Sequence, residues 1–139
     1  MDWKNKKPRI ALLNINADLY ELFKQVFAEG EIEIIEETIV EEKNGAILEE
    51  VKQYLALNDP EVVVWGVYAP LMENWLFYQE VKRLSTQGQC FIAITDDKKE
   101  LEREVGPNNA LEFLGNINDL ERIKEEILAE TGVCREREA

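Results

Sequence analysis

Residues 61–68 read EVVVWGVY, and this stretch decides the fold. Its side chains are continuously apolar rather than alternating with polar ones, which is typical of a parallel strand buried on both faces. The same character marks residues 9–15 (RIALLNI) and 90–95 (CFIAIT). A strand buried on both faces needs helices above and below it, so the sequence predicts a parallel sheet between two helical layers.

Helical patterns follow each predicted strand. The sequence predicts helices over residues 18–29, 47–55, 71–84 and 98–105, a last helix that starts at Asn118 or Asp119, and two weaker strands over residues 31–40 and 111–114. Right-handed crossovers would join these units into a doubly wound α/β sandwich of three layers, flavodoxin-like, with strand order 2-1-3-4-5. We expect one domain over residues 9–131, between a basic N-terminal tail (1–8) and a loose C-terminal tail (132–139).

Composition excludes several classes of function. The 139 residues carry a formal net charge of -13 and include no histidine, which disfavours nucleic-acid or anionic-membrane partners and removes histidine-based catalysis and metal binding. The apolar uncharged run over residues 62–72 has 11 residues, and no uncharged run exceeds the 12 residues of 84–95, fewer than the ~18 that a membrane span requires. Cys90 falls in a core strand and Cys134 in the polar tail, so we expect neither a disulfide nor a metal site, and a reducing cytoplasm.

Ligands of such sheets bind beyond the carboxyl ends of the strands. The first of these ends, residues 14–18, reads NINAD, which lacks the glycine- or hydroxyl-rich loop that binds a phosphate. A nucleotide or flavin site is therefore not expected, and no cofactor is predicted.

At these strand ends the chain resembles the receiver domain of bacterial two-component response regulators, the CheY-like family, over residues 9–130. Two positions match the family pattern. Thr95 ends the fourth strand where the family has a Thr or Ser that follows the phosphoryl group, and Phe113 lies at the switch-aromatic position of the fifth strand. The resemblance implies a signalling domain that acts through protein partners.

The other family positions depart from the pattern. Asn14 and Ile15 stand where the resemblance implies magnesium-binding acids, Gly66 stands at the phosphate-accepting Asp, four residues before Pro70, and Asn116 replaces the Lys. Magnesium needs carboxylate oxygens, and phosphoryl transfer to an aspartate needs an aspartate. The sequence therefore predicts a degenerate phosphorylation pocket with no catalytic residue and no metal.

Other interpretations of these residues remain open. Thr95 could be an ordinary strand residue or a helix cap, Phe113 could be plain core, and the pair Asp96-Asp97 could cap the fourth helix. A small neutral pocket could also be formed by polar side chains at the strand ends, namely Asn14, Asn16, Asp96 and Asn116.

The third predicted helix contains Trp75, Leu76 and Phe77 in succession, followed by Tyr78. At ~100° per residue these side chains spread around most of the helix, so one core cannot cover them all. Leu76 points away from the predicted core, and we expect a partner contact at Leu76 with Trp75 or Phe77. Residues 29–50 hold nine Glu against one Lys, which is either a solvated edge or a docking face for a basic partner.

The leading hypothesis from these observations is a pseudo-receiver, a phosphorylation-independent module that binds a protein partner or a second copy of itself and is not an enzyme. The alternative is a small-molecule sensor of the same fold that uses the neutral strand-end pocket. An enzyme working through carboxylates such as Asp18 and Asp96 has the least support, because the sequence places no acid-base pair.

Overall fold

The computed structural model describes residues 7–15, 17–27, 32–35, 48–85, 89–114 and 117–138. Its strands are β1 (Arg9–Leu13), β2 (Glu33–Ile34), β3 (Val62–Val67), β4 (Cys90–Thr95) and β5 (Leu111–Glu112). Its helices are α1 (Ala17–Phe27), α2 (Leu48–Asn58), α3 (Leu71–Leu84), α4 (Lys98–Val105) and α5 (Ile117–Glu138). Most of the acidic segment 29–50, including residues 36–47, lies outside the described part of the chain.

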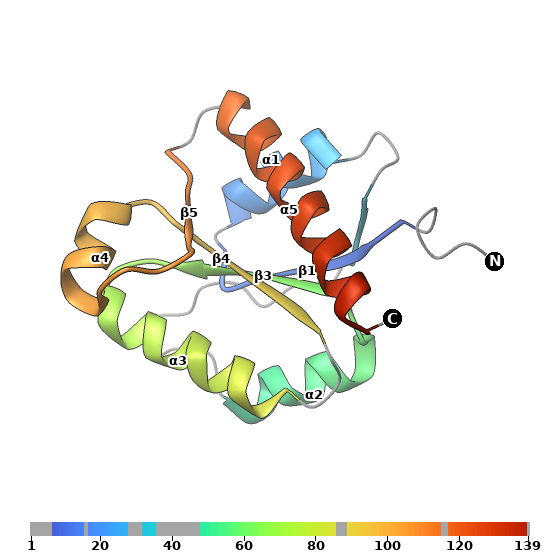
Figure 1. Ribbon diagram of the computed structural model, residues 1–139, viewed down its shortest axis with the longest axis horizontal. Coiled ribbons are helices and arrows are strands. Elements are labelled where there is room, and N and C mark those ends of the chain that lie inside the picture. The colour runs from blue at the N-terminus through green and yellow to red at the C-terminus, as the bar shows by residue number, and fades with distance from the viewer. Residues whose placement is uncertain are drawn as a thin grey trace.

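The five strands form one parallel sheet in the order β2-β1-β3-β4-β5, as the sequence predicted (Figure 1). Strand β3 lies at the centre, where Val62 is in register with Ile10 of β1 and with Cys90 of β4. All six residues of β3 are buried, as expected of a strand with a helical layer on each side.

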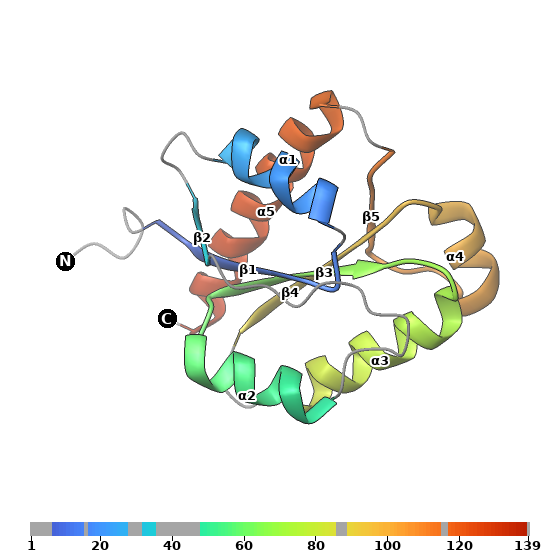
Figure 2. The same ribbon diagram turned by 180° about the vertical axis from the view of Figure 1, so that it is seen from behind.

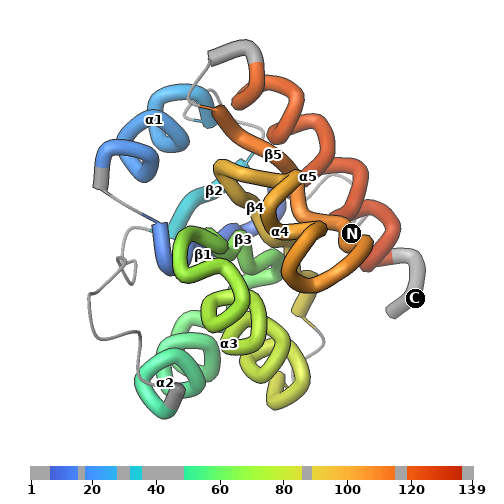
Figure 3. Tube along the Cα trace, turned by 90° about the vertical axis from the view of Figure 1, so that its left-hand side faces the viewer, coloured from blue at the N-terminus to red at the C-terminus, as the bar shows by residue number. Residues whose placement is uncertain are grey.

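Successive side chains of each strand point to opposite faces of the sheet and enter two separate cores. Val62 and Val64 pack in one core with the buried faces of α1 and α5, whereas Val63 and Trp65 pack in the other with α2, α3 and α4. The ribbon seen from behind and the end-on tube both show α1 and α5 above the sheet and α2 and α3 below it (Figures 2 and 3). The doubly wound architecture is therefore confirmed.

Helix α3 has the phase that the sequence predicted. Its core face consists of Leu71, Tyr78 and Val81, which are all buried. Leu76 is 58% exposed and Met72 is 37% exposed, so both lie off that face. None of the helices in the described residues combines the length and the hydropathy that a membrane span requires.

The last helix is longer than predicted. Leu120, Ile123 and Ile127 form its buried face, as expected, but α5 continues to Glu138 through the residues for which the sequence predicted a loose tail. Cys134 packs against the core of α1 and α5, and the guanidinium of Arg135 pairs with the carboxylate of Glu61. These tertiary contacts hold a segment whose composition alone indicates little structure.

Candidate functional site

The carboxyl ends of β1 and β3 meet through Asn14. Its backbone has a positive φ of 57°, a conformation that asparagine tolerates better than most residues and that turns the chain away from β1. The side-chain Nδ2 donates a hydrogen bond to the carbonyl oxygen of Gly66 at 2.8 Å and another to Oδ1 of Asn74 at 3.3 Å. Asn14 is 4% exposed, so this amide fastens two strand ends together and is not presented to solvent.

Gly66 lies in a position that has no room for a side chain. A Cβ built on Gly66 would stand 2.5 Å from the backbone oxygen of Asn14 and 2.5 Å from Cε2 of the Tyr68 ring. Real Cβ atoms essentially never approach another heavy atom so closely. The position that the resemblance aligned with the phosphate-accepting aspartate is filled by backbone and by an aromatic ring.

Asn74 and Tyr68 also belong to this site, although their sequence positions did not predict it. Asn74 lies in the first turn of α3, and its Nδ2 donates to the backbone oxygen of Tyr68 at 2.7 Å and to that of Pro70 at 3.2 Å. An asparagine in the first turn after a proline is a signal that its side chain bonds nearby backbone. The signal does not reveal that the same side chain also accepts from Asn14.

Ile15 is wholly buried and packs in the core with α1 and α5. The position at which the resemblance implies a magnesium-binding acid thus holds an aliphatic side chain in an apolar core, which offers no oxygen ligand. Asn16 and Asn116, also predicted to line the pocket, lie outside the described residues.

At the end of β4, Thr95 and Asp97 organise the turn into α4. The Thr95 hydroxyl oxygen accepts a hydrogen bond from the backbone N–H of Asp97 at 3.3 Å, and Thr95 is 1% exposed. The Asp97 carboxylate accepts from the N–H of Glu100 at 3.1 Å, which makes Asp97 the N-cap of α4. Asp96 is exposed. Thr95 and Asp97 therefore both act in the structure of the turn between β4 and α4.

Phe113 and Lys98 complete the described part of this edge. Phe113 is buried against Phe23, with ring centroids 6.4 Å apart, as a core residue. The Lys98 ammonium donates to the backbone oxygens of Asn108 at 2.8 Å and Ala110 at 2.6 Å and to Oδ1 of Asn108 at 2.8 Å. The Lys98 cation is therefore held by hydrogen bonds to the loop between α4 and β5.

The three residues predicted as a partner contact differ in exposure. Phe77 stacks on Trp65 of β3 with ring centroids 5.5 Å apart, and Trp75 lies 5.5 Å from the ring of Tyr78. Both are half-buried and contribute to the α2–α3–α4 core. Leu76 projects into solvent on the same helix.

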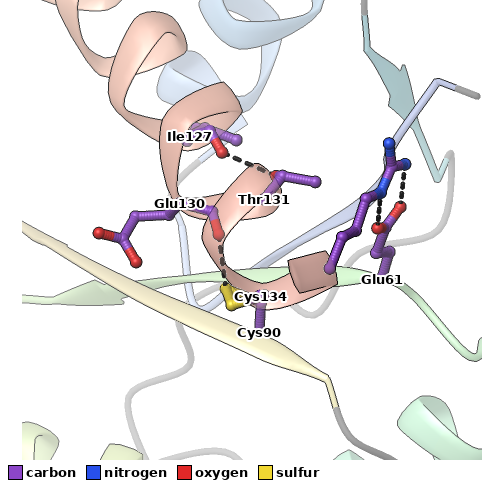
Figure 4. Close-up of a disulfide and its surroundings, with 7 residues drawn as sticks. Glu61, Cys90, Ile127, Glu130, Thr131 and Cys134 are labelled. Carbon is purple, nitrogen blue, oxygen red and sulfur yellow. Dashed lines mark hydrogen bonds and ion pairs between the residues drawn. A yellow bond between two sulfur atoms is a disulfide. The ribbon is translucent and has the colours of Figure 1, made fainter. Parts of the chain in front are cut away.

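The prediction of two unlinked cysteines was wrong. Cys90 at the start of β4 and Cys134 in α5 form a disulfide with a Cα–Cα distance of 6.1 Å (Figure 4). The two residues are 44 positions apart in the chain. Their proximity was not predicted because residues 132–139 were expected to form a loose tail. One ligand atom each from Cys90, Cys134 and Glu130 lies within 4.8 Å of the others. Disulfide sulfurs are not thiolates, so this cluster offers no strong metal ligands in its oxidised form.

Comparison with protein-family models and with curated protein sequences finds no match. Several solved structures of receiver domains have a similar fold. One is the signal receiver domain of a protein described as a Luxo repressor from Vibrio parahaemolyticus, at 15% identity and TM-score 0.67, covering 96% of each chain. Another is the receiver domain of an HD domain-containing protein from Pseudomonas fluorescens, at 13% identity and TM-score 0.61, covering 92% of this chain and 99% of that one.

The chemotaxis response regulator CheY4 of Vibrio cholerae also matches, at 17% identity and TM-score 0.56, covering 88% of this chain and 99% of that one. Identities this low establish a common fold and nothing about chemistry. The chain therefore has the CheY-like receiver fold, and its function has to be argued from its own residues.

Proposed function

We propose that this protein is a pseudo-receiver, a cytoplasmic bacterial signalling module that acts by binding a protein partner without being phosphorylated. The observation that carries the proposal is the environment of Gly66. The Asn14 backbone and the Tyr68 ring occupy the space that an acceptor side chain would need. Ile15 is buried, and the Asn14 amide is hydrogen-bonded to the Gly66 carbonyl oxygen. Neither side chain supplies the carboxylate ligands that magnesium prefers.

The proposal leaves binding as the mode of action. Receiver domains are small folds whose output depends on the surfaces that they present to partners, and loss of the phosphorylation site does not remove those surfaces. On the described part of this chain, α3 presents Leu76 and Met72 to solvent on one side of the helix. We assign the partner contact to this part of α3, with Trp75 and Phe77 supporting it from the core side.

The small-molecule sensor is the weaker alternative. Among the described residues, the Asn14 and Asn74 amides are hydrogen-bonded to each other and to backbone, so a ligand would have to break internal hydrogen bonds. Breaking a buried hydrogen bond costs about 1–3 kcal/mol per group left unsatisfied, which a small ligand must first recover.

The test is incubation of the purified protein with acetyl phosphate and magnesium, followed by intact-mass measurement. A receiver domain that has its acceptor aspartate serves as the positive control in the same buffer. We expect the mass of this protein to stay unchanged while the control gains one phosphoryl group. A stoichiometric gain that maps to an aspartate at the strand ends, such as Asp96 or Asp18, would overturn the proposal.

A further inference from the structure

The last two turns of α5 are weak as a helix. Residues 131–134 read TGVC, and threonine, glycine and valine all have poor helix propensity, glycine the poorest of the three. Val133 is 42% exposed and buries little apolar surface that could compensate. This part of α5 therefore depends on side-chain ties to the rest of the molecule.

Two such ties are present in the described residues (Figure 4). The disulfide joins Cys134 to Cys90, the first residue of β4. One residue further along, the Arg135 guanidinium forms a two-pronged ion pair with the Glu61 carboxylate, with Nη2 2.6 Å from Oε1. The hydrogen bonds with Glu61 raise the pKa of Arg135, so the guanidinium stays charged.

The two linked cysteines differ in exposure. Cys90 is 6% exposed, and its Sγ lies 3.8 Å from the backbone oxygen of Glu130. Cys134 is half-buried and is the more exposed of the two residues. The attack of a small thiolate from solvent is therefore assigned to Cys134.

We propose that the Cys90–Cys134 disulfide is a reversible redox latch that controls whether the end of α5 stays docked on the sheet. A low-molecular-weight thiolate attacks Cys134 Sγ, the S–S bond breaks, and Cys90 leaves as a thiolate that takes up a proton. A second thiol then displaces Cys134 from the mixed disulfide, so that the protein gains two electrons and two protons and the two small thiols become one disulfide. Re-oxidation by a small disulfide runs the same exchange backwards.

Opening the latch would change the surface of the protein. Leu128 and Cys134 are partly buried against the core of α1 and α5, so release of residues 131–138 would uncover apolar surface beside them. In a reducing compartment, disulfides are usually transient and redox-sensing rather than permanent. The latch goes beyond the proposed function, because it would couple the redox state to the exposed surface whether or not α3 binds a partner.

The test is hydrogen–deuterium exchange of the whole protein in glutathione buffers of defined redox poise. On reduction, we expect the amides of residues 131–138 to exchange at least tenfold faster, while those of β3 change much less. Cys134→Ser should reproduce the fast exchange under oxidising conditions and then show no further response to reductant. Glu61→Gln, which removes the negative charge from the pair with Arg135 and keeps the disulfide, should accelerate exchange less than reduction does.

Four results would overturn the latch. Two free thiols after oxidation by glutathione disulfide would mean that the bond does not form. Resistance of the native protein to reduced glutathione would make the disulfide a permanent brace. Unchanged exchange of residues 131–138 after reduction would show that the segment does not need the bond. The same conclusion would follow if one added zinc ion, bound by the reduced Cys90 and Cys134 with Glu130, kept these amides protected. An effect of Glu61→Gln equal to that of reduction would make the ion pair the controlling tie.

Discussion

The backbone oxygen of Asn14 lies 2.5 Å from the point where a Cβ of Gly66 would stand, while the Asn14 side chain donates a hydrogen bond to the Gly66 carbonyl at 2.8 Å. Two neighbouring strands thus meet at their carboxyl ends with no space between them for a side chain. Substitutions at either residue test whether the strand ends serve to pack β1 against β3 or to accept a phosphoryl group.

Gly66→Ala should destabilise the protein. The added methyl would overlap the Asn14 backbone, which cannot move without shifting β1, so we expect a loss of about 1–3 kcal/mol, typical of an overfilled core. Urea denaturation followed by circular dichroism would measure this loss. The matched control is Gly132→Ala in α5, where nothing lies within 4 Å of the new methyl, and which should stabilise by up to about 1 kcal/mol through helix propensity. Equal effects of the two substitutions would contradict the packing argument.

Gly66→Asp should lower stability further than Gly66→Ala and should not make the protein accept a phosphoryl group. The carboxylate would be forced against the Asn14 oxygen and the Tyr68 ring, with Ile15 still buried at the metal position. Intact-mass measurement after acetyl phosphate treatment would detect a gain. Efficient phosphorylation of this variant would mean that the strand ends rearrange readily. It would also mean that an aspartate at position 66 is enough to restore a phosphorylation site.

Asn14→Asp should destabilise the protein although the two side chains have the same shape. The substitution replaces the donating NH₂ with an oxygen that faces the Gly66 carbonyl and Oδ1 of Asn74, and we expect a loss of about 2–4 kcal/mol near neutral pH. Asn58→Asp makes the same chemical change in a half-buried amide that donates to the Tyr54 backbone at 3.0 Å, and should cost less than about 1.5 kcal/mol. A stable Asn14→Asp variant that binds magnesium would show instead that the first strand can still build a metal site.

Leu76→Glu should leave the fold intact and weaken association. Leu76 is exposed, so the loss of stability should stay within about 0.5 kcal/mol, whereas Val81→Glu on the core face of α3 should cost at least about 3 kcal/mol. Covering a leucine is worth about 1.5–3 kcal/mol, so binding of a partner or of a second copy should fall about tenfold or more.

Melting temperature and sedimentation velocity of the purified variants would separate the two effects. Leu57→Glu, at an 82% exposed leucine of α2, controls for a charge added elsewhere. If Leu76→Glu unfolds the protein like Val81→Glu, the helix phase is wrong. If Leu57→Glu weakens association as much as Leu76→Glu does, the contact is not specific to α3.

Stability should fall at alkaline pH through Tyr78. Burial raises the pKa of this phenol well above the ordinary tyrosine value of about 10, because the charged form would lose its hydration. Above pH ~10 the unfolded chain releases this proton and the folded protein retains it, so the free energy of unfolding decreases as the pH rises. Tyr78→Phe should remove part of that decrease. Urea denaturation of both proteins at pH 7 and at pH 11 would measure it, and an unchanged slope in the variant would assign the alkaline loss to other groups.

The architecture follows from the pattern of apolar and polar residues along the chain. Continuous apolar strands such as residues 61–68 require cover on both faces, and strand-helix alternation leaves few ways to provide it. The exposure of Leu76 also followed from sequence, because helical periodicity is a local property that survives in the folded protein. The absence of an acceptor side chain at Gly66 could be read directly from the printed residue.

The surroundings of these residues depend on contacts between segments that are far apart in the chain. Asn74 meets Asn14 from 60 positions away, and Cys90 meets Cys134 from 44 positions away. No periodicity encodes such pairings, because they depend on how helices of particular lengths settle on the sheet. The helical end of α5 depends on the tertiary structure in the same way. Its local propensity is poor, and the contacts of Arg135 with Glu61 and of Cys134 with Cys90, made only after the chain has folded, hold residues 131–138 in place.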